Sequence, residues 1–150
     1  MKKIAFLIAL LFTGLFTLNA QTGQLNLGKS GLAIDGYDPV AYLSTGKAVE
    51  GKSAISLAHN GATYRFSSVQ NRDLFKASPG KYLPQYGGWC AYAMGATGEK
   101  VSVDPETFKI IDGKLYLFYN SFFNNTLKDW NKNERTLKTS ADKNWQKFTL

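Results

Sequence analysis

The chain contains very few of the side chains that hold soft metals or carry out thiol chemistry. Its 150 residues include one cysteine, Cys90, one histidine, His59, and two methionines. A single cysteine excludes a disulfide within the chain and a dithiol redox cycle. A serine-type triad would depend on His59 alone, and no serine stands in a nucleophile-elbow pattern. These absences weigh against an enzyme, although a thiol enzyme that pairs Cys90 with His59 remains open.

The N-terminus has the pattern of a secretory signal peptide. Lys2 and Lys3 precede an apolar run from Ile4 to Leu18, and Ala20 offers a small residue for cleavage. The run is shorter than the roughly twenty apolar residues that a bilayer span needs. We therefore predict a signal peptide over residues 1–20, export to the periplasm or the cell exterior, and no stable membrane span after cleavage.

The rest of the chain is long enough for one domain with a core and too short for two. We predict a flexible segment over residues 21–30 and a single domain over residues 31–150. Residues 23–30 read GQLNLGKS and match the phosphate-loop pattern, but no buried strand precedes them, so nucleotide binding is not expected. The formal net charge is +7, with acidic residues mixed among the lysines, which favours a solvated surface over a nucleic-acid partner.

Two short turn sequences predict β-hairpins. Asn60-Gly61 separates expected strands at residues 53–59 and 62–67, and Asp112-Gly113 separates expected strands at residues 107–111 and 115–119. Four strands in two hairpins are enough for a small antiparallel sheet. Packed against several short helices, this sheet gives an α+β fold.

Capping residues predict where the first helices begin. Asp38 followed by Pro39 is typical of an N-cap and a first helical position. Ser67 and Gln70 form a capping box for a second helix, which ends before Pro79.

Apolar spacing predicts two further helices near the C-terminus. One is expected from Asn120 or Ser121 to about Lys132, and the other from Thr139. The apolar side of the first of these helices would consist of Phe122, Phe123, Leu127 and Trp130. We therefore expect both phenylalanines to contribute to packing.

Three motifs follow one another in a fixed order along the chain. Residues 36–42 read GYDPVAY, residues 64–68 read YRFSS, and residues 86–91 read YGGWCA, with Phe75 and Tyr82 between the last two. This pattern resembles the YHS domain family, and its exported branch in particular, over roughly residues 31–145. The resemblance implies a YHS-type α+β domain.

The resemblance also bears on metal binding. Relatives with a suspected metal role carry cysteines at the positions that Ala41, Ser67 and Asn71 occupy here. None of these three residues is a cysteine. A thiolate site for copper(I) or structural zinc therefore loses its ligands in this chain.

Cys90 is the residue on which the functional hypotheses depend. It is a small buried hydrophobe, a reactive or ligating thiol, or the partner of an intermolecular disulfide with another protein. Metal binding would use Cys90, Met94 and His59, a set that suits copper(I) better than harder ions. The identity of a metal or other cofactor stays open.

We predict a binding module for a metal ion or a small ligand near Cys90. The expected ligand-binding residues are Cys90, Tyr37, Tyr42, Tyr64, Phe66, Gly87, Gly88 and Trp89. Aromatic walls with one soft polar group suit a metal ion or a small organic molecule. The alternatives are a thiol-dependent enzyme or redox partner that uses Cys90, and a structural or interaction module without a ligand.

Overall fold

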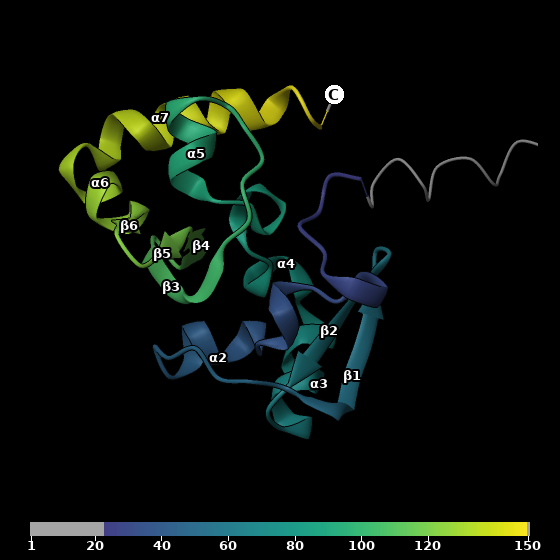
Figure 1. Ribbon diagram of the computed structural model, residues 1–150. Helices are drawn as coiled ribbons and strands as arrows, with labels where there is room; N and C mark the ends of the chain where they lie inside the picture. The colour runs from purple at the N-terminus through teal and green to yellow at the C-terminus, as the bar shows by residue number, and fades with distance from the viewer. Residues whose placement is uncertain (1–22, 150) are drawn as a thin grey trace, which may run out of the picture.

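A computed structural model of the protein describes residues 23–149, in which short helices alternate with two-stranded antiparallel sheets (Figure 1). The predicted α+β class is confirmed. The predicted signal peptide over residues 1–20 lies outside the described residues. Among residues 23–149, the structure contains no helix that is both long and apolar enough to span a membrane.

The helices and strands of the first half surround one hairpin. In chain order they are η1 (Lys29–Gly31), η2 (Ile34–Gly36), α2 (Pro39–Ser44), β1 (Lys52–His59), β2 (Ala62–Phe66), α3 (Val69–Ala77) and α4 (Pro79–Tyr82). The second half contains η3 (Gln85–Gly88), α5 (Ala91–Ala96), β3 (Asp104–Ile111), β4 (Lys114–Phe118), β5 (Asn120–Ser121), β6 (Asn124–Asn125), α6 (Thr126–Lys132) and α7 (Glu134–Gln146).

Both predicted hairpins are present, and their turns have the backbone geometry that the sequence demands. The φ angles are 48° at Asn60 and 79° at Gly61, and 51° at Asp112 and 72° at Gly113. Two consecutive left-handed residues are the mark of a type I′ turn, which matches the twist of the strands it joins. The hairpins belong to separate two-stranded sheets, because β1 pairs with β2 and β3 pairs with β4. They do not merge into the one small sheet that we expected.

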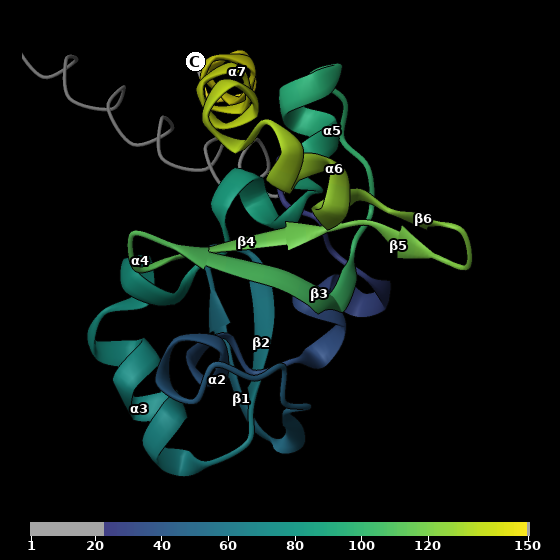
Figure 2. The same ribbon diagram turned by 90° about the vertical axis from the view of Figure 1, so that its left-hand side faces the viewer.

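Strand β4 lies between two hydrophobic cores. Successive side chains of a strand point to opposite faces. Leu115 and Leu117 therefore belong to the first core, and Tyr116 and Phe118 belong to the second, with all four side chains buried. Figure 2 shows β3 and β4 crossing the molecule between the helices α5 to α7 on one side and the first hairpin on the other.

The two cores are defined by their buried residues. The first core consists of Ala33, Ile34, Val40, Tyr42, Ala62, Tyr64, Phe66, Phe75, Tyr82, Leu115 and Leu117. The second core consists of Tyr86, Ala91, Met94, Tyr116, Phe118, Trp130 and Ala141. Glycine permits the closest approach in the second core: a Cβ at Gly95 would lie 2.5 Å from the carbonyl oxygen of Leu137, so α5 and α7 pack backbone to backbone.

The predicted helix from residue 120 is wrong in its first turns. Residues 120–125 form the small hairpin β5–β6, and α6 begins only at Thr126, with the Asn125 side chain accepting a hydrogen bond from the Leu127 N–H at 3.1 Å. The backbone N–H of Thr126 donates to the carbonyl oxygen of Tyr119 at 3.1 Å, which closes the hairpin at its base. Consequently Phe122 and Phe123 lie at the tip of a hairpin and not on an apolar helix face.

Two other helix starts differ from the sequence prediction. Helix α3 is capped by Ser68, whose hydroxyl accepts from the Asn71 N–H at 3.1 Å, because the Ser67 side chain is engaged elsewhere. Helix α7 begins at Glu134 rather than at Thr139, directly after the turn at Asn133 that ends α6. The cap at Asp38 is confirmed, with Oδ1 accepting from the Val40 N–H at 2.9 Å.

Residues 24–27, which belong to the segment predicted to be flexible, pack against the rest of the domain. The indole N–H of Trp89 donates to the carbonyl oxygen of Gln24 at 2.7 Å. The backbone N–H of Asn26 donates to the carbonyl oxygen of Gly87 at 2.8 Å. Leu25 and Leu27 pack against the first core. The segment therefore connects the first core to the glycine-containing stretch before Cys90.

Candidate functional site

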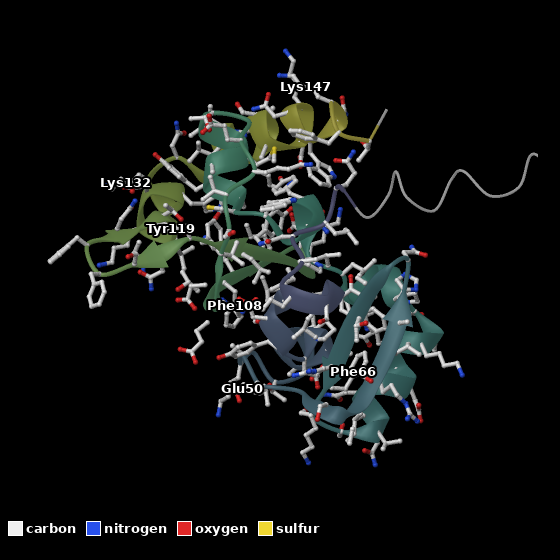
Figure 3. The ribbon with its side chains drawn as sticks, turned by 45° about the vertical axis from the view of Figure 1, so that its right-hand side comes forward. Glu50, Phe66, Phe108, Tyr119, Lys132 and Lys147 are labelled. Atoms are coloured by element: carbon white, nitrogen blue, oxygen red, sulfur yellow. The ribbon has the colours of Figure 1, made fainter. Side chains whose placement is uncertain are left out.

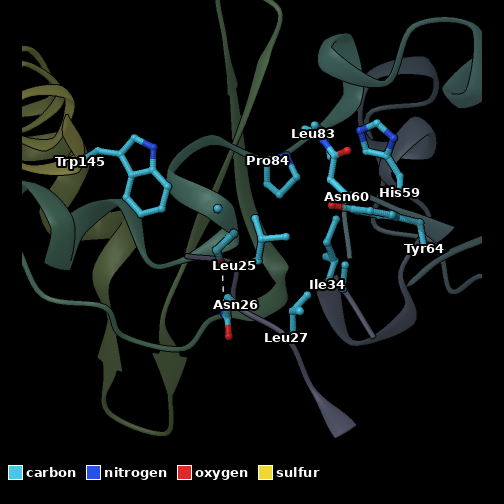
Figure 4. A pocket seen from close by; sticks show the side chains of 13 residues that line it. Leu25, Asn26, Leu27, Ile34, His59, Asn60, Tyr64, Leu83, Pro84 and Trp145 are labelled. Atoms are coloured by element: carbon cyan, nitrogen blue, oxygen red, sulfur yellow. Dashed lines mark hydrogen bonds between the residues drawn. The ribbon is translucent and has the colours of Figure 1, made fainter. Parts of the chain in front are cut away.

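A cavity of about 220 Å³ opens between the two halves of the molecule (Figure 4). Its walls come from the N-terminal segment, the first hairpin, the stretch from residue 83 to residue 88, and helix α7. The lining residues are Leu25, Asn26, Leu27, Ala33, Ile34, His59, Asn60, Tyr64, Leu83, Pro84, Gly87, Gly88 and Trp145. Most of these side chains are apolar, and the few polar groups among them mark where a ligand could be oriented.

The Tyr64 hydroxyl is the polar group most directly available to a ligand. The ring is buried at 3% exposure, and within the described part of the chain the hydroxyl makes no hydrogen bond to protein. Among residues 23–149, every side-chain oxygen or nitrogen that is shielded from solvent has a hydrogen-bond partner. Because the Tyr64 hydroxyl has none, its oxygen must be accessible to solvent. Figure 4 shows the phenol directed into the cavity. It can therefore donate one hydrogen bond to a bound molecule.

His59 lies on the same wall as Tyr64. It is half-buried, and its ring meets the Phe75 ring edge-on at a centroid distance of 5.7 Å. The next residue, Asn60, also lines the cavity. The turn thus adds an imidazole and an amide to the rim of an otherwise apolar wall.

Burial changes the acidity of Tyr64. Removal from water disfavours the charged phenolate and raises the pKa of Tyr64 to about 12. Burial likewise raises the pKa of Tyr42 and of Tyr86 above the ordinary tyrosine value. At neutral pH the Tyr64 side chain is therefore an uncharged donor, which suits a neutral acceptor such as a carbonyl oxygen.

This pKa predicts a specific loss of stability in alkali. Above pH 10 an unfolded Tyr64 loses its proton while the folded one keeps it, so stability falls as pH rises toward the folded pKa of about 12. Between pH 9 and pH 11 this residue alone should cost roughly 1 kcal/mol of stability. Urea unfolding at both pH values should show that Tyr64→Phe loses roughly 1 kcal/mol less than the wild type. Equal losses in the two proteins would contradict the burial of this phenol.

Adjacent glycines let the N-terminal segment close the cavity. Gly87 and Gly88 have φ angles of 62° and 84°, in the left-handed region that favours glycine. A Cβ at Gly87 would lie 2.7 Å from the carbonyl oxygen of Gln24 and 2.9 Å from the Trp145 ring. The Asn26 side chain then donates to the Gly88 carbonyl oxygen at 3.0 Å. The consequence of these left-handed glycines is a cavity wall made of residues 25–27.

Cys90 lies apart from this cavity and is completely buried. Its sulfur accepts a hydrogen bond from the Tyr119 N–H at 3.3 Å and lies 3.5 Å from the Thr126 hydroxyl oxygen. That hydroxyl gives its one proton to the Tyr119 carbonyl oxygen at 2.8 Å, so the thiol donates in the contact with Thr126. Both faces of the thiol are thus occupied by the protein itself. A reagent or a partner's thiol could reach it only after local opening.

The three predicted metal ligands do not form a site. Met94 follows Cys90 by one helical turn and is buried in the second core, whereas His59 lies on the cavity wall beside Phe75 of the first core. Within residues 23–149, no group of three or more His, Cys, Asp or Glu side chains is placed to hold a metal ion. The donor set therefore offers no support for copper(I) at Cys90.

The remaining predicted ligand-binding residues have structural contacts. The Tyr42 hydroxyl donates to the Pro105 carbonyl oxygen at 2.9 Å, and Phe66 is buried against Phe75. Tyr37 is half-buried against the first core, and its hydroxyl donates to Glu106 at 3.1 Å. Trp89 fastens the N-terminal segment through its indole N–H. Of the eight predicted residues, the cavity collects Tyr64, Gly87 and Gly88.

Ala41, Ser67 and Asn71 surround one buried carboxylate. Asp38 is fully buried, and its Oδ2 accepts from the Ser67 N–H at 2.8 Å, the Ser67 hydroxyl at 2.6 Å and the Asn71 amide at 2.7 Å. Its Oδ1 accepts from the N–H groups of Val40 and Ala41. Five donors satisfy this carboxylate, so the cluster ties α2 to β2 and α3 without needing a cation.

Comparisons of this chain with protein-family models, with curated proteins and with solved structures find no match. The resemblance to the YHS domain family therefore stays a prediction. What the chain binds has to be argued from the cavity itself.

Proposed function

We propose that the protein is a binding module for one small, mostly apolar organic molecule that carries a hydrogen-bond acceptor. The observation that supports this proposal is the Tyr64 hydroxyl, which faces an apolar cavity and has no protein partner among the described residues. A hydroxyl that opens onto an apolar cavity without a protein partner is free to donate to a bound molecule. A neutral acceptor on a flat apolar molecule fits both the walls and this donor.

In this proposal the chain is an exported module of the YHS type, as the sequence predicts, but its ligand lies beside Tyr64 and His59 and not at Cys90. The apolar walls supply the affinity, because they remove ligand surface from water. Tyr64 supplies the orientation, with the Asn26 and Asn60 amides and His59 at the rim. No covalent step is assigned, and Cys90 serves as packing for the second half of the chain.

A matched pair of probes tests the proposal. Acetophenone and ethylbenzene have nearly the same shape, but only acetophenone carries a carbonyl acceptor. Amide shifts in two-dimensional NMR should saturate with both compounds at lining residues, and acetophenone should bind about three- to tenfold more tightly. In Tyr64→Phe this preference should disappear while ethylbenzene binding persists.

The control is Tyr92→Phe, which removes a half-buried phenol packed against the second core. This variant should keep the preference for acetophenone. Shifts that spread over surface residues without saturation would overturn the proposal. So would a Tyr64→Phe variant that still prefers acetophenone.

A further inference from the structure

The hairpin β5–β6 exposes two adjacent aromatic side chains. Phe122 is 98% exposed and Phe123 is 104% exposed, at the turn between two-residue strands. Single exposed apolar residues are ordinary, but two phenylalanines side by side on a projecting turn form an apolar patch of the kind that marks interaction sites. Figure 2 shows this hairpin extending from the body of the molecule beyond β3 and β4.

The hairpin is braced, so the position of its tip is defined by the fold. Asn120 pairs with Asn125 and Ser121 pairs with Asn124. The Asn120 amide donates to the Thr107 hydroxyl at 3.0 Å, which fastens the hairpin to β3. The strand residues are all polar, and apolar surface is confined to the two turn residues.

Basic side chains lie next to this tip. Lys128 and Lys132 on α6 are exposed and line the same hollow of about 320 Å³ as Phe122 and Phe123. Lys132 pairs with Asp129 at 2.6 Å, and Lys128 has no ion pair among residues 23–149. Figure 3 shows Lys132 on the side of the molecule where the hairpin projects. The chain as a whole is basic, with a formal net charge of +7.

We infer that the tip of the β5–β6 hairpin is a peripheral anchor that inserts Phe122 and Phe123 into the surface of an anionic lipid bilayer. A projecting apolar tip can insert into a soft surface, and the boundary between lipid headgroups and acyl chains accepts apolar side chains in this way. Lys128 and Lys132 would meet anionic headgroups as the tip enters. This inference rests on the exposed hairpin and the neighbouring lysines of α6, and it is independent of the cavity and of its proposed ligand.

Co-sedimentation with vesicles tests the anchor. The protein is purified after export, with its N-terminus established by mass spectrometry, and mixed with phosphatidylcholine vesicles with or without about one third phosphatidylglycerol. We expect binding to the anionic vesicles that weakens as salt rises from about 0.05 M to about 0.5 M. The double variant F122S/F123S should bind at least about tenfold more weakly. Replacing Lys128 or Lys132 by Gln should weaken binding about fivefold each.

Matched controls separate the anchor from general stickiness and from misfolding. V69S/L74S removes two other exposed apolar residues, 45% and 49% exposed, and should bind vesicles as the wild type does. F122L/F123L should keep most of the binding, and the thermal midpoint of F122S/F123S should be unchanged because its side chains are not packed.

Two results would overturn the inference. The first is a wild type that does not bind anionic vesicles. The second is a double serine variant that binds them as well as the wild type does. If the wild type does not bind vesicles but self-associates through the phenylalanines in sedimentation velocity, the tip is assigned to a second copy of the chain.

Discussion

Asp38→Ala should destabilise the protein by at least about 3 kcal/mol, measured by urea unfolding at neutral pH. The substitution removes the acceptor of five hydrogen bonds at a site with no access to solvent. Three donors are backbone N–H groups, and two of these begin helix α2. Each buried donor left without a partner costs about 1–3 kcal/mol, and loss of the helix cap adds to this.

Two variants give this prediction its controls. Asp73→Ala removes a carboxylate that is 59% exposed and, among residues 23–149, forms an ion pair only with its neighbour Arg72, so we expect a change within about 0.5 kcal/mol. Asp38→Asn keeps one acceptor oxygen but turns an amide N–H₂ toward existing donors. Its loss of unfolding free energy should therefore lie between those of Asp38→Ala and Asp73→Ala. A cost below about 1 kcal/mol for Asp38→Ala would contradict a buried, fully bonded carboxylate.

Trp130→Ala should cost about 3–5 kcal/mol of unfolding free energy. Trp130 is completely buried and is the largest side chain of the second core. Its ring packs against Phe118 at a centroid distance of 5.4 Å and Tyr116 at 6.0 Å, and its indole N–H donates to Glu134 at 3.0 Å. Truncation leaves a cavity between β4 and α6 that the rigid strand cannot fill.

The matched control for Trp130 is an apolar residue outside both cores. Leu74 on α3 is 49% exposed, so Leu74→Ala should cost less than about 1 kcal/mol. Trp130→Phe keeps an aromatic ring, so its loss of unfolding free energy should lie between those of Trp130→Ala and Leu74→Ala. Similar costs for Trp130→Ala and Leu74→Ala would mean that α6 does not pack on the sheet as described.

The features that the sequence predicts correctly are those decided by neighbouring residues. Asn60-Gly61 and Asp112-Gly113 tolerate consecutive positive φ angles, so the two turns can be located without knowing what surrounds them. Asp38 before Pro39 is likewise a local signal, because the cap is completed within three residues. Ser67 shows the limit of this reasoning. The Ser67 hydroxyl donates to the Asp38 carboxylate, so it does not cap α3, and Ser68 is the N-cap residue instead.

The features that depend on distant packing could not be predicted. The run KLYLF in β4 is buried on both faces, so it separates two cores, and no alternation marks which residue faces which core. Phe122 and Phe123 fit an amphipathic helix by composition. The closure of Thr126 onto Tyr119 places them on a turn instead.

The site was predicted around the rarest side chain and lies elsewhere. Cys90 satisfies its hydrogen bonds internally, whereas the cavity is built by residues with no chemical signature in the sequence, such as Leu25, Pro84 and Trp145. Tyr64, Gly87 and Gly88 were predicted, because an alternating strand and adjacent glycines are local signals. What joins them is the N-terminal segment, whose docking depends on contacts across more than sixty residues.

The location of bound acetophenone is the most direct test of the proposed function. Isotope-filtered nuclear Overhauser effects report which protein protons lie next to the ligand. We predict contacts from acetophenone to the rings of Tyr64 and Trp145 and to the Leu25 and Ile34 methyl groups, all of which line the cavity. Contacts to the surroundings of Cys90, or no intermolecular contacts at saturating ligand, would contradict a binding site beside Tyr64.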